Sequence, residues 1–301
     1  MCSIKTAVIP AAGLGTRLLP ATKTIPKELI PILAKPSIEY VMVEAVDAGI
    51  TEFIIIVGDN GELMEDYFTP PSGYGNLKVE LNARFDGLNY ILSKAKVRYV
   101  QQDEPKGLGH AVFCAKDYID DDYFAVILPD DIIVQDPPCL SKLIDVSVRL
   151  NGGSLAVIQV PRHKVSSYGI VNAEATDLPN THQIHGLMEK PSVDTAPSNL
   201  AVVGRYVLPT SIFAYLRDAA PGAGGEIQLT DAISELLDNH SIYACEVTGE
   251  RHDVGNKLGL AKAWMRFALD DPEVGAAFKE YAASLLVDEG SLLTSHCLRE
   301  V

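Results

Sequence analysis

The most informative part of this chain begins with Lys5-Thr-Ala-Val-Ile-Pro-Ala-Ala-Gly-Leu-Gly-Thr-Arg17. Its apolar run, Ala7–Ile9, has the composition of a buried strand and leads directly into a loop of small residues that contains Gly13 and Gly15. Glycines let a backbone approach an anion closely and direct its N–H groups toward it. The arginine that ends the stretch, and Lys27 further along, add two positive charges for phosphate oxygens. We therefore predict a strand followed by a loop that binds a polyphosphate.

Two well-known phosphate loops do not fit the same residues. A dinucleotide-binding fingerprint needs a third glycine three residues after the second, and Leu18 stands there, which disfavours a dehydrogenase. A P-loop needs Gly-Lys-Ser or Gly-Lys-Thr at its end, and neither follows Gly15. The loop instead resembles the signature of the sugar-phosphate nucleotidyltransferases, which runs Gly-x-Gly-Thr-Arg, then Pro, then Pro-Lys, then Pro. The matching residues are Gly13, Gly15, Thr16, Arg17, Pro20, Pro26, Lys27 and Pro31.

Composition places the chain among ordinary globular proteins, with 47% hydrophobic and 22% charged residues. No apolar run has the length of a membrane span and no secretory signal precedes the first strand, so we expect a cytoplasmic protein. The five cysteines are scattered without C-x-x-C pairs, which disfavours disulfides and structural zinc. A net charge of −15 argues against binding to nucleic acids or anionic membranes. Anionic substrates would need a local positive cleft, for which the candidates are Arg17, Lys23, Lys27 and Lys190.

The first half of the chain alternates short apolar runs with amphipathic segments. This rhythm predicts a mostly parallel sheet with helices on both faces, a Rossmann-like three-layer α/β sandwich. In such sheets ligands bind beyond the carboxyl ends of the strands. The expected strands are Thr6–Ile9, Phe53–Val57, Val97–Val100 and Phe124–Leu128, and the expected helices are Ser37–Ala48, Gly61–Phe68, Leu88–Lys94 and Gly109–Lys116.

After about residue 150 the pattern changes to a mixed sheet that ends in helices. The expected strands are Leu155–Val160, Ile170–Asn172, Gln183–Glu189 and Ala201–Leu208, and the expected helices are Ser211–Arg217, Thr230–Asp238, Lys257–Phe267 and Glu273–Leu286. We divide the catalytic domain into a nucleotide-binding part, 1–135, and a sugar-phosphate-binding part, 136–260, followed by a C-terminal helical segment, 261–301. The turn at 59–61 and the breaker-rich loop at 69–76 indicate either a binding lid or an excursion that faces a partner.

The segment that follows the third expected strand carries a candidate site for a base. The side chain of Gln102 offers a donor and an acceptor together, which suits the edge of a pyrimidine, and Gly107 lets the backbone come close to a ring. From these residues alone a polar turn remains an alternative. The family resemblance implies that both residues bind the base of the nucleotide. It also implies nucleotide contacts from Ala11, Ala12, Gly13 and Gly15.

Two acids follow the strand that ends near Leu128. Hard divalent cations choose carboxylate oxygens, and Mg2+ takes one or two of these together with phosphate oxygens and water. Asp130 and Asp131 also suit a turn or a helix cap, so the sequence leaves that alternative open. The resemblance implies that Asp130 and the distant Asp253 hold Mg2+, and that Asp131 assists at the sugar.

A third candidate site combines an acid with a cation. Glu189 and Lys190 offer a hydrogen-bond acceptor for sugar hydroxyls and a charge for a sugar phosphate, although Glu-Lys-Pro is also a common surface tripeptide. The preceding Tyr168-Gly169 makes the pattern more specific. The resemblance implies that Glu189 and Lys190 bind the sugar and its phosphate, that Gly169 closes against the ring, and that Val202 lines the same pocket.

Stretches 198–207, 221–232 and 252–259 resemble the bacterial members of the family that act on UTP and glucose 1-phosphate. The resemblance implies direct in-line, Mg2+-assisted transfer of a uridylyl group to glucose 1-phosphate, giving UDP-glucose and pyrophosphate. The implied catalytic residues are Arg17, Lys27 and Lys190, and the implied assembly is a homodimer or homotetramer. The alternatives are the same chemistry with dTTP or another hexose 1-phosphate, and a non-catalytic paralogue that binds sugar nucleotides.

Overall fold

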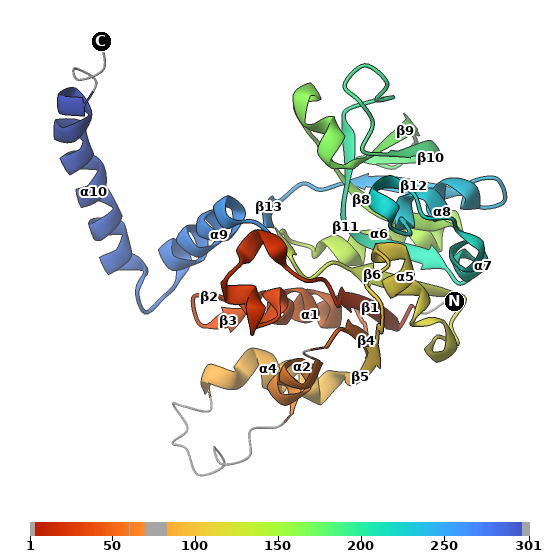
Figure 1. Cartoon of the computed structure of the whole chain (residues 1–301), viewed down its shortest axis with the longest axis horizontal. Helices are drawn as coiled ribbons and strands as arrows, with labels where there is room; N and C mark the ends of the chain where they lie inside the picture. The colour runs from red at the N-terminus through yellow and green to blue at the C-terminus, as the bar shows by residue number, and fades with distance from the viewer. Residues whose placement is uncertain (1–3, 60, 70–82, 297–301) are drawn as a thin grey trace.

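A computed structural model describes residues 4–59, 61–69 and 83–296. One nine-stranded sheet forms its centre, in the order β5-β4-β1-β6-β11-β8-β12-β10-β9 (Figure 1). The chain fills one side of this sheet before it begins the other, because β1, β4, β5 and β6 are all neighbours at one end. The bounds are β1 Thr6–Ala11, β4 Glu52–Val57, β5 Lys96–Gln101, β6 Tyr123–Ile127, β8 Gly153–Gln159, β9 Gly169–Ala175, β10 Thr181–Glu189, β11 Leu200–Pro209 and β12 Ile242–Glu246.

The parallel part of the sheet confirms the alternation of strands and helices predicted from the sequence. β1 pairs in parallel with β4 and β6, and β4 pairs in parallel with β5. The intervening helices return the chain to the same edge each time, which is why all these strands end on one side. The helices are α1 Ser37–Asp47, α2 Gly61–Phe68, α4 Asp86–Lys94 and α5 Leu108–Phe113.

The second part of the sheet is mixed. β11 runs antiparallel to both β6 and β8, whereas β12 runs parallel to β8. β10 is antiparallel to β12 and β9, and β9 touches β11 again through Ala201 and Ile170. This last pairing curls the far end of the sheet back on itself. The helices of this part are α6 Cys139–Leu150, α7 Ile212–Asp218 and α8 Leu229–Leu236.

Two large buried clusters on opposite faces of the sheet produce the three layers. Adjacent residues of β1 point to opposite faces, so Ile9 joins one cluster with Met42 of α1 and Leu143 of α6. Val8 joins the other cluster with Val112 of α5 and other residues from α7 and α8. The structure therefore confirms the expected three-layer α/β sandwich with a mixed, mostly parallel sheet.

Several boundaries differ from the sequence prediction. The helix expected at Gly109–Lys116 ends at Phe113, and a separate 3-10 turn follows at Lys116–Tyr118. The strands β7 (Asp131–Val134) and β13 (Glu250–Asp253) were not predicted, because each is short and pairs only with the other. The remaining short elements are β2 Pro31–Ile32, β3 Lys35–Pro36 and 3-10 turns at Thr16–Leu18, Ala21–Lys23, Lys27–Leu29, Ala83–Phe85, Arg162–Ser167 and Ala223–Gly225. Residue 60 of the predicted turn and residues 70–76 of the predicted loop lie outside the described part.

The two C-terminal helices confirm the prediction and extend it. α9 spans Lys257–Asp270 and packs beside β13, and α10 spans Gly275–His296. α10 projects away from the body of the molecule (Figure 1). Across the described residues, no helix has both the length and the apolar character that a bilayer crossing requires.

Candidate active site

The loop that follows β1 has a fixed, left-handed bend. Gly15 has φ 60°, and a Cβ there would lie 2.9 Å from the methyl group of Thr22. The hydroxyl of Thr22 donates to the carbonyl of Gly15 at 2.8 Å. Glycine is therefore required at this position, and the loop from Ala11 to Arg17 is held open at the end of the strand.

Lys27 is held by acids beneath this loop. Its Nζ lies 2.5 Å from Oδ2 of Asp130, and the buried carboxylate of Glu28 lies 3.8 Å away. Burial alone would lower the pKa of Lys27, but the negative charges of Asp130 and Glu28 outweigh it and raise that pKa. Burial opposes the charge on Asp130 too, yet Lys27 and Arg17 together lower the pKa of its carboxyl. Both partners of the Lys27–Asp130 pair are consequently charged at neutral pH.

Glu28 is the less usual of the two acids near Lys27. Its side chain is fully buried, and among the described residues neither carboxylate oxygen has a hydrogen-bond partner. Burial, partly offset by Lys27, raises the pKa of Glu28 to about 7. The carboxyl therefore sits near its titration point beside the charged Lys27.

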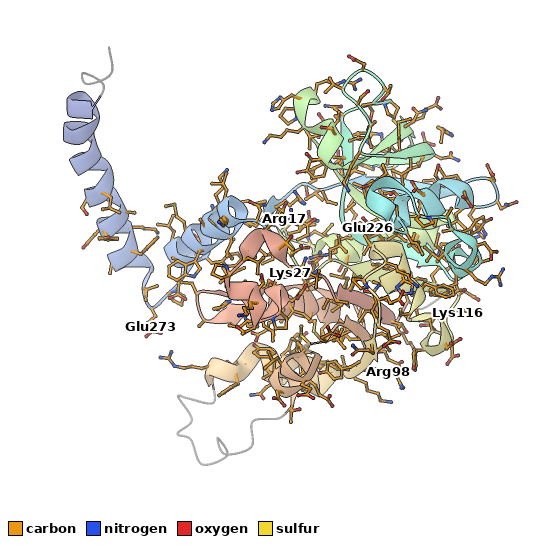
Figure 2. The ribbon with its side chains drawn as sticks, viewed as in Figure 1. Arg17, Lys27, Arg98, Lys116, Glu226 and Glu273 are labelled. Carbon is orange, nitrogen blue, oxygen red and sulfur yellow. The ribbon has the colours of Figure 1, made fainter. Side chains whose placement is uncertain are left out.

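A first cavity, of about 440 Å3, contains Gln102 and is named the Gln102 cavity. Gly107 lines it with φ 107°, and a Cβ there would lie 2.7 Å from Glu226 Cβ and 2.8 Å from the carbonyl of Ile227. Only glycine fits between these backbones. Figure 2 places Glu226 opposite the segment that carries Arg17 and Lys27. The other predicted residues that line this cavity are Ala12, Gly13, Gly15, Lys27 and Asp130.

A second cavity, of about 450 Å3, contains Glu189 and is named the Glu189 cavity. Glu189 ends β10 opposite Gly169 of β9, and its Oε2 accepts a hydrogen bond of 2.8 Å from the hydroxyl of Thr230. Its other oxygen lies 3.1 Å from Nζ of Lys190. Lys190 has a left-handed backbone, φ 43°, which turns the chain after β10. The other predicted residues here are Arg17, Asp130, Asp131, Gly169, Val202 and Asp253.

The two cavities adjoin at Asp130, which lines both together with Leu128. A third cavity, of about 350 Å3, shares Gly13 and Lys27 with the Gln102 cavity and is also lined by Ala11 and Lys23. The structure thus brings every site residue expected from the sequence to one of three adjoining cavities. The cations expected to form a positive cleft lie there as well.

The short β7–β13 ladder explains how a distant acid reaches the site. It aligns Asp253 with Asp131, and the Val254 N–H donates to the carbonyl of Asp130 at 2.8 Å. Asp131 itself is 3% exposed and faces protein partners, because Arg251 Nε lies 2.7 Å from it and the Gly204 N–H donates to it at 2.7 Å.

Sequence reasoning missed two residues that line these cavities, Arg251 and Thr230, and one that contacts a lining residue, His110. Thr230 lies within the stretch 221–232 that was quoted for its resemblance, and Arg251 directly precedes the stretch 252–259, but no role was assigned to either. His110 contacts Gln102, and a histidine two residues into a helix gave no signal of that contact. The signal available for Arg251 was its position two residues before Asp253 on a predicted site segment.

The acids present suit a magnesium ion better than a metal held wholly by protein. Among the described residues, no three His, Cys, Asp or Glu side chains converge in a way that would hold a metal. Asp130 and Asp253 both line the Glu189 cavity and offer the one or two carboxylates that Mg2+ normally takes from a protein. The donor set therefore fits an ion that completes its shell with phosphate oxygens and water.

Comparisons with known proteins agree with this geometry. The model of the nucleotidyl transferase family matches residues 6–268. The chain belongs to this family. It is 42% identical to a UTP–glucose-1-phosphate uridylyltransferase of Bacillus subtilis over 296 residues, which cover 96% of this chain and 99% of that protein. The resemblance to this branch of the family, expected from the sequence, is therefore confirmed.

Solved structures lead to the same branch of the nucleotidyl transferases. A UTP-bound UGPase from Acinetobacter baumannii superposes with a TM-score of 0.83 at 40% identity, covering 94% of this chain and 99% of that one. A UDP-glucose pyrophosphorylase complexed with UDP-glucose also gives 0.83, at 36% identity, covering 89% of this chain and all of that one.

Proposed function

We propose that this protein transfers a uridylyl group from UTP to glucose 1-phosphate, giving UDP-glucose and pyrophosphate. The observation that carries the proposal is the meeting of the Gln102 and Glu189 cavities at Asp130, with Lys27 lining the first cavity and Lys190 the second. Two anionic reactants bound in these cavities would meet at that junction. The uridylyltransferase relative and the UTP-bound and UDP-glucose-bound neighbours support the choice of substrates.

The proposed reaction needs no covalent enzyme intermediate. A phosphate oxygen of glucose 1-phosphate forms a bond to the α-phosphorus of UTP, and the bond from that phosphorus to the bridging oxygen breaks to release pyrophosphate. The barrier comes mainly from bringing two polyanions together, so orientation and charge neutralisation should supply most of the catalysis. Lys190 would orient the attacking phosphate. Arg17 and Lys27 would neutralise the triphosphate and the departing pyrophosphate.

The other residues of the site would hold the ends of the two substrates. Gln102 would bind the uracil edge, and the backbone of Gly107 would lie against the ring. The loop residues Ala11, Ala12, Gly13 and Gly15 would direct N–H groups at the nucleotide. On the other side Gly169, Glu189, Val202 and the Arg251-paired Asp131 would surround the sugar.

Asp130 and Asp253 would hold Mg2+ in this proposal. Bound there, the ion would supply Lewis-acid charge neutralisation and a template for the phosphates. Lys27 and Asp130 are paired to each other in the structure, at 2.5 Å. Binding of a triphosphate would therefore give Lys27 a phosphate oxygen as a new partner and leave the Asp130 carboxylate available to a cation.

The experiment that tests the proposal is a pyrophosphate-release assay over a panel of nucleotides and sugar phosphates. UTP, dTTP and CTP would each be paired with glucose 1-phosphate and galactose 1-phosphate, and the sugar nucleotide formed would be identified by chromatography. We expect the highest kcat/KM for UTP with glucose 1-phosphate. A protein that binds UTP but releases no pyrophosphate with any pair would instead be the non-catalytic paralogue.

Assembly, location and internal division complete the proposal. We infer a homodimer or homotetramer, because the C-terminal helices carry exposed apolar side chains such as Trp264, Met265 and Tyr281. Sedimentation of the full chain would test this. A cytoplasmic location, and the division into parts 1–135, 136–260 and 261–301, belong to the same proposal.

A further inference from the structure

The carboxamide of Gln102 is held from one side. Its side chain is 6% exposed, and its nitrogen Nε2 lies 2.7 Å from Nδ1 of His110 and 3.5 Å from the carbonyl oxygen of Gly107. Both contacts use amide hydrogens. Within the described part of the chain, no group donates to the amide oxygen Oε1. This oxygen therefore remains the acceptor that the side chain offers to a ligand in the Gln102 cavity.

The contact also defines the state of the histidine. A carboxamide nitrogen can only donate, so Nδ1 of His110 must accept, and the single proton of the neutral ring must be on Nε2. Burial and the nearby charge of Lys106 lower the pKa of His110, against an opposing effect of Glu104. The ring is therefore neutral at pH 7, and its acceptor nitrogen faces Gln102.

Pyrimidine bases differ at the edge that such an amide would meet. Uracil and thymine carry N3–H, a donor, whereas cytosine carries an unprotonated N3, an acceptor, beside an amino group at C4. An outward Oε1 accepts from N3–H but repels the lone pair of a cytosine N3. Rotating the amide by 180° would suit cytosine, but Oε1 would then meet Nδ1, which could donate only if the ring proton moved there from Nε2. With Nδ1 facing Gln102, the hydrogen bond from the ring to the backbone of Glu104 uses the Nε2 proton and opposes that move. His110 therefore opposes the orientation that cytosine needs.

We propose that His110 is a positioning residue that fixes the Gln102 carboxamide with its oxygen toward the nucleotide, and thereby excludes cytosine nucleotides. This inference rests on the proposed function and extends it to the class of base that the enzyme accepts. It assigns a role in selectivity to a residue that touches neither phosphate nor sugar in the proposed reaction. It predicts no discrimination between uracil and thymine, which share N3–H.

Two substitutions of His110 test its hydrogen-bond acceptor and its planar ring separately. His110→Phe keeps a planar ring but removes the acceptor, so the amide can rotate. His110→Asp keeps an acceptor and, when ionised, has no proton to donate, so the amide stays fixed. The matched control is His240→Phe, because His240 is also half-buried and makes one hydrogen bond, to Ser211 at 3.0 Å, away from all three cavities.

The main measurement is the ratio of kcat/KM for UTP to that for CTP, at saturating glucose 1-phosphate and pH 8. We expect a ratio of at least about 100 for the natural protein, because a site built to hydrogen-bond one edge rejects the other strongly. His110→Phe should lower the ratio at least about tenfold, mostly through KM, since roughly one hydrogen bond is exchanged. His110→Asp should keep it within about threefold, and His240→Phe should leave it unchanged. An unchanged ratio in His110→Phe, or an equal loss in His110→Asp, would overturn the inference.

Two further measurements remain informative if a variant folds poorly or turnover is absent. Calorimetric dissociation constants for UTP and CTP should show the same selectivity, so a protein that releases no pyrophosphate would sink the proposed function but still test His110. Nitrogen NMR of histidine-labelled natural protein should show Nδ1 without a proton and Nε2 protonated at pH 7.5. A proton on Nδ1 would exclude the proposed orientation without any substitution.

Discussion

The Gln102 and Glu189 cavities hold their cations in different ways. The side chain of Lys27 is 18% exposed and is paired with Asp130 beside the buried Glu28. The side chain of Lys190 is 49% exposed and lies against Glu189 at the surface of its cavity. A buried charge cannot be left without a partner, so Lys27 must exchange one anion for another when a phosphate arrives, whereas Lys190 is open to it. Lys27 is thus held in advance by internal ion pairs, whereas Lys190 is accessible to a ligand, although the sugar side also contains one buried pair, Asp131 with Arg251.

The largest expected effect is at Asp130, where the two cavities join. Asp130→Asn removes the anionic partner of Lys27 and one of the two carboxylates proposed for Mg2+. We expect turnover to fall by about 1000-fold or more, the size seen when a central electrostatic group is removed from an active site. Pyrophosphate release measured over a series of Mg2+ concentrations checks this.

Asp121→Asn is a suitable control for that change, because Asp121 accepts a hydrogen bond from Thr6 at 3.2 Å and lines none of the three cavities. It should keep nearly full turnover. If Asp130→Asn is active at ordinary Mg2+ concentrations, the metal assignment is wrong.

Lys190→Ala should affect only the Glu189 cavity, where glucose 1-phosphate is proposed to bind. We expect turnover to fall by roughly 100-fold or more, because the attacking phosphate loses its orienting charge. The dissociation constant for UTP should change little, since Lys190 lines the Glu189 cavity and not the Gln102 cavity. Calorimetry and steady-state kinetics measure the two effects separately. Weakened UTP binding, or normal turnover, would remove Lys190 from this role, and the exposed Lys164→Ala serves as the control.

The sequence could predict the parts of the fold that have a local pattern. Strands β1, β4, β5 and β6 were found because each is a compact apolar run followed by a helix, which is the pattern of a parallel sheet. The strands β7 and β13 were not predicted because their stability comes from pairing between segments that are far apart in the chain. Helix α6 was not predicted, although Leu140, Leu143 and Val146 have helical spacing.

The site residues show the same limit at a finer scale. The motif residues Arg17, Asp130 and Lys190 were identified by type and order along the chain, and the fold brings them together. Partners that depend on three-dimensional contact were not identifiable, such as Thr230 on Glu189 or His110 on Gln102. A one-dimensional pattern names groups that carry chemistry, but not the side chains that orient them.

Glu28 gives the nucleotide side a dependence on pH that can be tested by stability alone. Its pKa is raised from 4.5 to about 7 in the folded protein, so unfolding releases a proton between these values. Stability from this group is therefore greatest below pH 4.5 and falls as the pH rises to 7, by roughly 3 kcal/mol at about 1.4 kcal/mol for each pKa unit. Glu28→Gln should lack this decline and be more stable than the natural protein at pH 8, but not at pH 4.5.

Urea unfolding at the two pH values measures that difference, and Glu235→Gln, an exposed change on α8, is the control. Equal pH slopes for Glu28→Gln and the natural protein would show that Glu28 is ionised in the folded state. In that case the nucleotide side would contain no buried acid with a raised pKa, and pH would not distinguish it from the sugar side.

The smallest expected effect belongs to Thr230, which orients Glu189 from helix α8. Thr230→Val keeps the shape but removes the hydroxyl that donates to Glu189 Oε2 at 2.8 Å. Loss of one such bond, worth about 1 kcal/mol, should raise KM for glucose 1-phosphate about fivefold and leave KM for UTP unchanged. Thr230→Ser retains the donor and should restore the natural value. An equal loss in Thr230→Ser would mean that the methyl group, which lies where a Cβ on Gly169 would clash, matters more than the hydrogen bond. The sugar side would then be shaped by packing, as the nucleotide side is at Gly107.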